Sequence, residues 1–344
     1  MTTTGALDEV VGFTAGDGMA LSLVHVVGES SPTLGPVLLV HGAGVRANIF
    51  RAPVESNLVD VLLAAGYDVW MENWRASLDL PPNQWTLDRA AAWDHPQAVK
   101  AVMGRTGADS LKAVIHCQGS TSFMMSAVAG LIPEVTTIVT NAVSLHPVLS
   151  RLARWKIEAV HRPAKALTRY LDPRWGIEAP DLIAEAVVGW VRLTHHECDN
   201  TVCRMASFTY GVGKPTLWSH ANLNEATHEW LRHEFGAVPL TFFDQMARCV
   251  RAGELVAVDG LSDLPARFGS APPRTDARVV LLAGERNRCF SPESQRRTYE
   301  FLKANGKGKY EMHLLPGYGH LDVFMGKDAA VDVFPIISAA LAVD

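Results

Sequence analysis

Two side chains that could perform covalent catalysis stand out, a cysteine and a histidine far apart in the chain. Cys117 lies between an apolar run that predicts a short strand and the stretch 120–130, where apolar residues recur at helical spacing. A thiol at such a bend would be exposed for attack on a carbonyl carbon. His320 lies in a glycine-rich loop just before the last predicted helix and could take the thiol proton. The pair predicts acyl transfer through a covalent thioester on Cys117.

The bend matches the nucleophile elbow, G-x-S-x-G, with Cys117 in the serine position and Ile115 in place of the first glycine. On this basis the chain resembles the α/β-hydrolase superfamily over nearly its whole length. The run His-Cys-Gln-Gly-Ser is similar to the cysteine-bearing branch, which includes polyhydroxyalkanoate synthases and hydrolase-like domains attached to cholesterol-oxidase-like flavoproteins. The segments Glu72-Asn73-Trp74-Arg75-Ala76-Ser77 and Gly317-Tyr318-Gly319-His320-Leu321-Asp322 also resemble acid lipases.

The resemblance implies the rest of the site. The loop His41-Gly42-Ala43-Gly44 matches the oxyanion loop, so the backbone N–H groups of Ala43 and Gln118 would hold the developing oxyanion. Asn287 occupies the place of the usual acid and would orient His320 by accepting from its ring N–H. The helix N-terminus predicts a lowered pKa for the thiol. A thiolate–imidazolium pair would then offset the missing acid charge, as in Cys-His-Asn proteases.

Each of these assignments has an alternative. Cys117 could be a buried structural cysteine, the commonest state of a free thiol. Ser120 is a rival nucleophile, although its place inside the helix suits a packing or capping residue. Glu285 is the alternative to Asn287 as the group that orients the histidine. Asp322 follows the histidine closely and is expected to brace its loop.

The elements that must position these residues alternate along the chain, and such alternation predicts a mainly parallel eight-stranded sheet with helices on both faces. Strands are predicted at 9–14, 20–26, 36–40, 67–71, 111–115, 135–143, 277–282 and 309–315. Helices are predicted at 54–65, 85–107 with an interruption near Pro96, 120–130, 292–305 and 323–342. From about His146 to Arg267 helical patterns follow one another. The resemblance therefore implies an α/β-hydrolase core at 1–145 and 268–344, with a helical cap at 146–267 inserted after the sixth strand.

Composition indicates an ordinary globular enzyme of 344 residues, with 48% hydrophobic and 19% charged residues. The net charge of −5 gives no reason to expect nucleic-acid binding. No apolar stretch is long enough to span a bilayer, and no secretory signal is recognisable at the N-terminus. Five cysteines in a chain of this length do not form a disulfide framework. We therefore expect a cytoplasmic, thiol-reducing location.

The predicted cap carries weaker signals. The stretch from Arg151 to Arg174 holds seven Lys or Arg and two acidic residues, which indicates a solvated face or a contact with acyl-CoA phosphates or an acyl carrier protein. Most tryptophans in this region are expected to pack within the cap, although an aromatic roof over the site would suit a bulky hydrophobic acyl substrate. They are Trp155, Trp175, Trp190, Trp218 and Trp230. The run His195-His196-Glu197-Cys198-Asp199 with Cys203 does not match the spacing of a closed zinc site. We expect no metal and no cofactor.

The predicted substrate is a hydrophobic acyl ester or thioester. Water as the acceptor would make the protein an esterase, lipase or thioesterase, and an alcohol or amine would make it an acyltransferase. Two other classes fit the same residues. One is a non-catalytic binder of a hydrophobic ligand, and the other uses the site for carbonyl addition, elimination or cyclisation. The acyl group, the acceptor and the oligomeric state do not follow from residue types.

Overall fold

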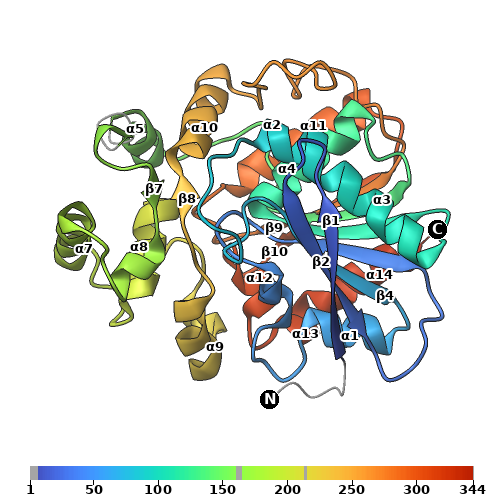
Figure 1. The fold of residues 1–344 in the computed structure, drawn as a ribbon, viewed down its shortest axis with the longest axis horizontal. Helices are drawn as coiled ribbons and strands as arrows, with labels where there is room; N and C mark the ends of the chain where they lie inside the picture. The colour runs from blue at the N-terminus through green and yellow to red at the C-terminus, as the bar shows by residue number, and fades with distance from the viewer. Residues whose placement is uncertain (1–6, 160–164, 213–214, 344) are drawn as a thin grey trace.

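The structure, a computed structural model, describes residues 7–159, 165–212 and 215–343. Eight strands form one sheet in the order β1-β2-β4-β3-β5-β6-β9-β10 (Figure 1). The strands are β1 (Leu7–Thr14), β2 (Ala20–Val27), β3 (Pro36–Val40), β4 (Asp68–Asn73), β5 (Leu111–His116), β6 (Val135–Asn141), β9 (Arg278–Gly284) and β10 (Tyr310–Leu315). Antiparallel pairing is confined to β1 with β2 and β2 with β4, and the other pairs are parallel. The predicted mainly parallel sheet is confirmed.

Helices cover both faces of the sheet because its central strands are apolar on both sides. All five residues of β3 are buried, and alternate residues belong to two separate hydrophobic clusters. One face carries α1 (Leu58–Ala64), α12 (Asp322–Met325), α13 (Ala329–Asp332) and α14 (Phe334–Leu341). The other carries α2 (Leu87–Arg89), α3 (His95–Thr106), α4 (Cys117–Ala129) and α11 (Pro292–Asn305).

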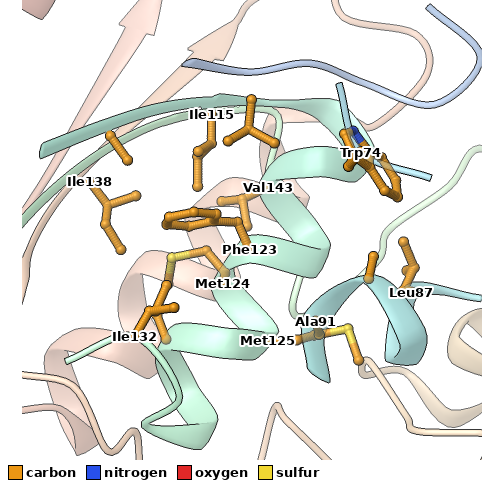
Figure 2. Packing of buried hydrophobic residues seen from close by; sticks show 14 of the residues in the cluster. Trp74, Leu87, Ala91, Ile115, Phe123, Met124, Met125, Ile132, Ile138 and Val143 are labelled. Atoms are coloured by element: carbon orange, nitrogen blue, oxygen red, sulfur yellow. The ribbon is translucent and has the colours of Figure 1, made fainter. Parts of the chain in front are cut away.

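Helix α4 is the central helix of its face. Every one of its residues is buried, so it has no solvent-exposed polar stripe of the kind that a surface helix carries. Figure 2 shows Phe123 and Met124 among apolar side chains of the neighbouring strands, which include Ile115 of β5 and Ile138 of β6. This packing fixes the position of the residue at the start of the helix.

Three predicted helices differ from the observed ones. Helix α1 begins at Leu58 because Asn57 forms a capping box with Asp60. The α-helical pattern is interrupted near Pro96, as expected, by a turn of another helix type rather than by a break in the chain's helical path. A π-helical turn at Ala90–Asp94 joins α2 to α3. The last predicted helix is divided into α12, α13 and α14.

The segment between β6 and β9 carries its helices to one side of the sheet (Figure 1). Its main helices are α5 (Arg151–Ala159), α7 (Leu182–Thr194), α8 (Thr201–Tyr210), α9 (Glu225–Trp230) and α10 (Leu240–Ala252). It also contains two strands, β7 (Tyr170–Leu171) and β8 (Val238–Pro239), which pair antiparallel and are too short to predict from a pattern. Within the described ranges, no helix has the length and apolar character required to cross a membrane.

A pair of glycine substitutions tests the packing of α4. A Cβ at Gly119 would lie 2.0 Å from the carbonyl oxygen of His41, whereas a Cβ at Gly104 in α3 would meet nothing within 4 Å. Gly119→Ala should therefore lower the free energy of unfolding by more than about 2 kcal/mol. Gly104→Ala should raise it by about 0.5–1 kcal/mol. Urea denaturation of the two variants measures both, and equal stabilities would contradict the close approach.

Candidate active site

Cys117 occupies a sharp bend between β5 and α4. Its φ of 56° lies in the left-handed region, which is uncommon for residues other than glycine. Such backbone strain costs about 1–3 kcal/mol and is concentrated at functional sites. A Cβ at Gly42 would lie 2.9 Å from the Cβ of Cys117, so the oxyanion loop is also in direct contact with the bend. The predicted strand, turn and helix are therefore present, with the thiol at the turn.

The Cys117 sulfur faces two backbone donors. The N–H groups of Gln118 and Ala43 lie close enough to this sulfur to lower the pKa of the thiol. These are the two groups that the sequence predicted for the oxyanion hole. Ala43 comes from the loop after β3, and Gln118 is the residue after Cys117. The residue is 6% exposed, and its accessible side opens into a cavity. The arrangement can stabilise negative charge on an atom bonded to this sulfur.

His320 lies in the loop between β10 and α12, and one of its ring nitrogens is within 4.8 Å of the Cys117 sulfur. The backbone holds the residue at both ends, because its N–H donates to Leu217 O (3.1 Å) and its carbonyl accepts from Asn141 Nδ2 (2.9 Å). Among described atoms, its buried Nε2 has no hydrogen-bond partner. The structure thus brings together the predicted thiol and imidazole.

Asn287 contacts His320 as predicted, but with the opposite hydrogen-bond direction. Its Oδ1 accepts from the N–H groups of Cys289 (3.0 Å) and Phe290 (3.1 Å), so its NH₂ group faces Nδ1 of His320 at 3.0 Å. The amide therefore donates to the ring, and the neutral imidazole carries its hydrogen on Nε2. The expectation that Asn287 accepts from the ring N–H is wrong in this state, because two backbone donors hold the amide oxygen.

The expected ion pair is also wrong. Burial raises the pKa of the Cys117 thiol to about 12, and the N–H groups of Gln118 and Ala43 offset this only in part. Burial lowers the pKa of His320 to about 3. Desolvation outweighs the favourable N-terminus of α4 because both groups lie in a dry environment without an opposing charge. The resting site consequently holds a neutral thiol and a neutral imidazole.

The alternative residues lie elsewhere. Glu285 is exposed and accepts from Gly317 N (3.0 Å). Asp322 is buried and accepts from Gly319 N (2.8 Å) and Ser219 N (3.1 Å), which agrees with the bracing role predicted for it. Ser120 donates to Cys117 O (2.6 Å) inside α4, as expected for a packing or capping residue.

The oxyanion loop is braced from two sides. Trp74 Nε1 donates to His41 O (2.9 Å), and Gly44 N donates to Ala76 O (3.0 Å). The segment 72–77 thus holds the loop that follows β3. From the other side, the Tyr210 hydroxyl donates to Ala43 O (2.9 Å). Sequence reasoning missed Tyr210, because only tertiary structure brings α8 to this loop.

A cavity of about 190 Å³ extends from Cys117 between the sheet and the segment that carries α5 to α10. Most of its lining side chains are aliphatic or aromatic, including Phe208, Phe242, Phe243 and Phe290. Among the described residues that line this cavity there is no tryptophan, and Trp155 and Trp190 are each 61% exposed, so the alternative of a tryptophan roof is wrong. The charged group at the wall is Lys156, whose amine donates to the carbonyls of Phe208 and Gly211. The cavity suits an apolar group next to the sulfur.

Within the described ranges, two groups of side chains have the composition of metal ligands. His116, Cys117 and His320 form one, and Cys198, Cys203, His220 and His228 form the other. The second group was missed because spacing rules look for nearby pairs, whereas His228 follows Cys198 by 30 residues. The other histidines of the predicted metal-like run, His195 and His196, belong to neither group.

Comparison with known proteins identifies the architecture. No known protein-family profile matches the chain. The chain matches solved structures over nearly its whole length, such as an esterase from Thermogutta terrifontis (TM-score 0.56, 15% identity, 96% of this chain and 97% of that one). A monoacylglycerol lipase from Paleococcus ferrophilus gives a TM-score of 0.57 at 13% identity over 94% of this chain and 99% of that one. The chain has the α/β-hydrolase fold.

Two curated proteins are similar in sequence. Human lipase member K is 23% identical over 325 residues, which are 87% of this chain and 77% of the lipase. Sterol esterase 2 of Saccharomyces cerevisiae is 26% identical over 157 residues, which are 38% of this chain and 29% of the esterase. The relatives in sequence are thus a lipase and an esterase.

The protonation states predict the pH dependence of thiol reactivity. Only the thiolate reacts, and the pKa of Cys117 is about 12, so its thiolate fraction rises with pH throughout the neutral range. The rate of Cys117 alkylation by iodoacetamide should increase about tenfold per pH unit between about pH 7 and pH 9. Peptide mass spectrometry distinguishes Cys117 from the other four cysteines. A rate that is level across this range would instead indicate a preformed ion pair.

Proposed function

We propose that this protein is an acyl-transferring enzyme that carries a hydrophobic acyl group from an ester or thioester as a thioester on Cys117. The observation that carries the proposal is the sulfur at the end of an apolar cavity, facing the N–H groups of Ala43 and Gln118. Similarity in sequence to a human lipase and a yeast sterol esterase supports ester chemistry. We assign the roles of nucleophile, base and orienting group to Cys117, His320 and Asn287.

The reaction would proceed in two displacement steps. As the sulfur of Cys117 bonds to the carbonyl carbon, its proton passes to Nε2 of His320 and the oxyanion accepts from the two backbone N–H groups. When the bond to the leaving oxygen or sulfur breaks, the imidazolium returns the proton to that atom. The acceptor then loses its proton to His320 as it attacks the thioester, and the Cys117 thiol is released with its proton.

Asn287 makes the first step costly. To accept a proton at Nε2, His320 must carry its other hydrogen on Nδ1, and Asn287 must then turn its oxygen toward the ring. That rotation gives up the bonds to the N–H groups of Cys289 and Phe290. At about 0.5–1.5 kcal/mol for each bond, the cost is about 1–3 kcal/mol. We therefore infer a slower acylation than an aspartate would allow.

The cavity suggests the class of acyl group. Its volume of about 190 Å³ is below the roughly 300–1,000 Å³ of sites that hold drug-sized ligands, which favours short or medium acyl chains. We propose that residues 146–267 act as the cap that encloses this group. Lys165 pairs with Asp244 and Arg174 with Asp172, so part of the basic stretch is used within the cap. Because part of the basic stretch is already paired, we propose a simple ester or thioester as the acyl donor in preference to acyl-CoA or an acyl carrier protein.

Covalent adduct formation tests the proposal directly. Incubation with short and medium p-nitrophenyl esters and acyl thioesters should add one acyl group to Cys117, detectable in the intact-protein mass and removable by hydroxylamine. Cys117→Ala should give no adduct, and His320→Ala should slow acylation by about 10²–10⁴-fold. Addition of water, alcohols or amines then identifies the acceptor from the product. Ligand binding without an adduct would favour a non-catalytic binder, and full turnover by both variants would favour carbonyl addition or elimination.

A single substitution tests the role of Asn287. In Asn287→Asp one oxygen can accept from Cys289 and Phe290 while the other accepts from Nδ1 of His320, so no bond is lost. The rate of acylation should rise by about 5–100-fold, which corresponds to the cost of rotating the amide. Glu285→Gln, a change of an exposed carboxylate on the same loop, should leave the rate unaltered. A rate loss in Glu285→Gln, together with no gain in Asn287→Asp, would transfer the orienting role to Glu285.

A further inference from the structure

Four side chains in the segment 198–228 converge on one point that the proposed reaction does not use. They are Cys198, which precedes α8, Cys203 in its first turn, His220 in the 3₁₀ turn His220–Asn222, and His228 in α9. Their ligand atoms all lie within 4.8 Å of one another. Cys198 Sγ is 3.4 Å from Nε2 of His228, and Cys203 Sγ is 3.4 Å from Nε2 of His220.

These distances are those of a tetrahedral metal site. With Zn–S bonds of about 2.3 Å and Zn–N bonds of about 2.0–2.1 Å, neighbouring sulfur and nitrogen ligands lie about 3.5 Å apart. Two thiolates and two imidazoles also form a donor set that selects Zn²⁺ over Mg²⁺ or Ca²⁺, which prefer oxygen. We propose that Cys198, Cys203, His220 and His228 bind one Zn²⁺ ion. Four protein ligands leave no open position, so the ion would be structural.

The backbone and side chain of Asn200 hold Cys198 and two other ligands in positions that suit metal binding. Asn200 N donates to Cys198 Sγ at 3.2 Å, a contact that stabilises a thiolate ligand. The side chain of Asn200 accepts from the N–H of Cys203 (3.2 Å) and donates to His228 O (3.2 Å). One residue thus links three of the four ligands in a fixed arrangement. The rings of His220 and His228 meet edge to face, with centroids 5.0 Å apart.

The ion would hold the cap against the loop that carries His320. Leu217 O, three residues before His220, accepts from the N–H groups of His320 (3.1 Å) and Leu321 (2.7 Å). Asn222, two residues after His220, donates to Asp322 Oδ2 (2.7 Å). Cys203 belongs to α8, whose last residues line the cavity. Zinc would therefore position the cavity wall and the His320 loop without touching substrate.

Two other arrangements of the same atoms are possible. Cys198 and Cys203 could form a disulfide, since their sulfurs also lie within 4.8 Å of each other. Alternatively, a metal could bind at His116, Cys117 and His320. Whether an ion is bound, and which residues bind it, distinguishes the three cases. The test does not depend on whether the protein transfers acyl groups.

Metal analysis of the purified full chain, produced with zinc in the medium, is the first measurement. We expect about one zinc per chain by mass spectrometry of the elements. Replacement by Co²⁺ should give the visible bands of a tetrahedral thiolate site, and this measurement needs no variant. Cys198→Ser and His228→Asn should lose the metal and the bands. Cys249→Ser, a buried cysteine outside the cluster, and His196→Asn, an exposed histidine near it, are matched controls that should retain both.

A second set of measurements decides the alternatives. Cys117→Ser should keep the zinc, and removal of zinc by a chelator should lower Tm by at least about 5 °C. The proposal is overturned if zinc-supplied protein contains no metal and gives no Co²⁺ bands. It is also overturned if the metal is lost in Cys117→Ser but kept in Cys198→Ser. An intact mass about 2 Da below the reduced value, with the Cys198 and Cys203 peptides joined, would establish the disulfide instead.

Discussion

The close approach of α4 to the loop His41–Gly44 is the constraint on which the geometry around Cys117 depends. Gly119 has room for no side chain because the carbonyl oxygen of His41 occupies the space where a Cβ would be. This contact places the first turn of α4 directly beneath the loop, and Cys117 must adopt a positive φ to join strand and helix. Only then do the N–H groups of Ala43 and Gln118 face the same sulfur. Packing of a backbone, more than any side-chain contact, creates the anion-stabilising geometry.

Burial from solvent disfavours the charged forms of the Cys117 thiol and the His320 imidazole, whereas the nearby backbone N–H groups favour negative charge. A buried thiol and a buried imidazole each resist charge, so burial raises the pKa of Cys117 and lowers that of His320. A carboxylate in the place of Asn287 would counter this effect on the imidazole by its charge. The amide instead donates to Nδ1, which favours neutrality. The site therefore favours a neutral thiol and a neutral imidazole at rest, and in the proposed reaction charge would develop only during attack on a carbonyl carbon.

Local patterns were sufficient to predict the parts of the fold and site that are continuous in sequence. The apolar run of β5, the position of Gly119 and the loop His41–Gly44 can each be read from a few neighbouring residues, and all lie where they were expected. The direction of the Asn287 amide could not be read in this way, because it depends on the N–H groups of Cys289 and Phe290 after the loop has folded. The pKa shifts of Cys117 and His320 depend mainly on burial, and the expectation based on the N-terminus of α4 did not include burial.

Several residues that the sequence analysis did not single out join the segment 146–267 to the rest of the chain. Tyr210 reaches Ala43 from α8, and Leu217 holds the backbone of His320. Arg46, just after the oxyanion loop, pairs with the buried Glu234 at 2.7 Å. Because these contacts hold the loop His41–Gly44 and the backbone of His320, a displacement of the segment 146–267 would disturb both. In the proposed reaction, the segment 146–267 would therefore help to position these groups as well as cover them.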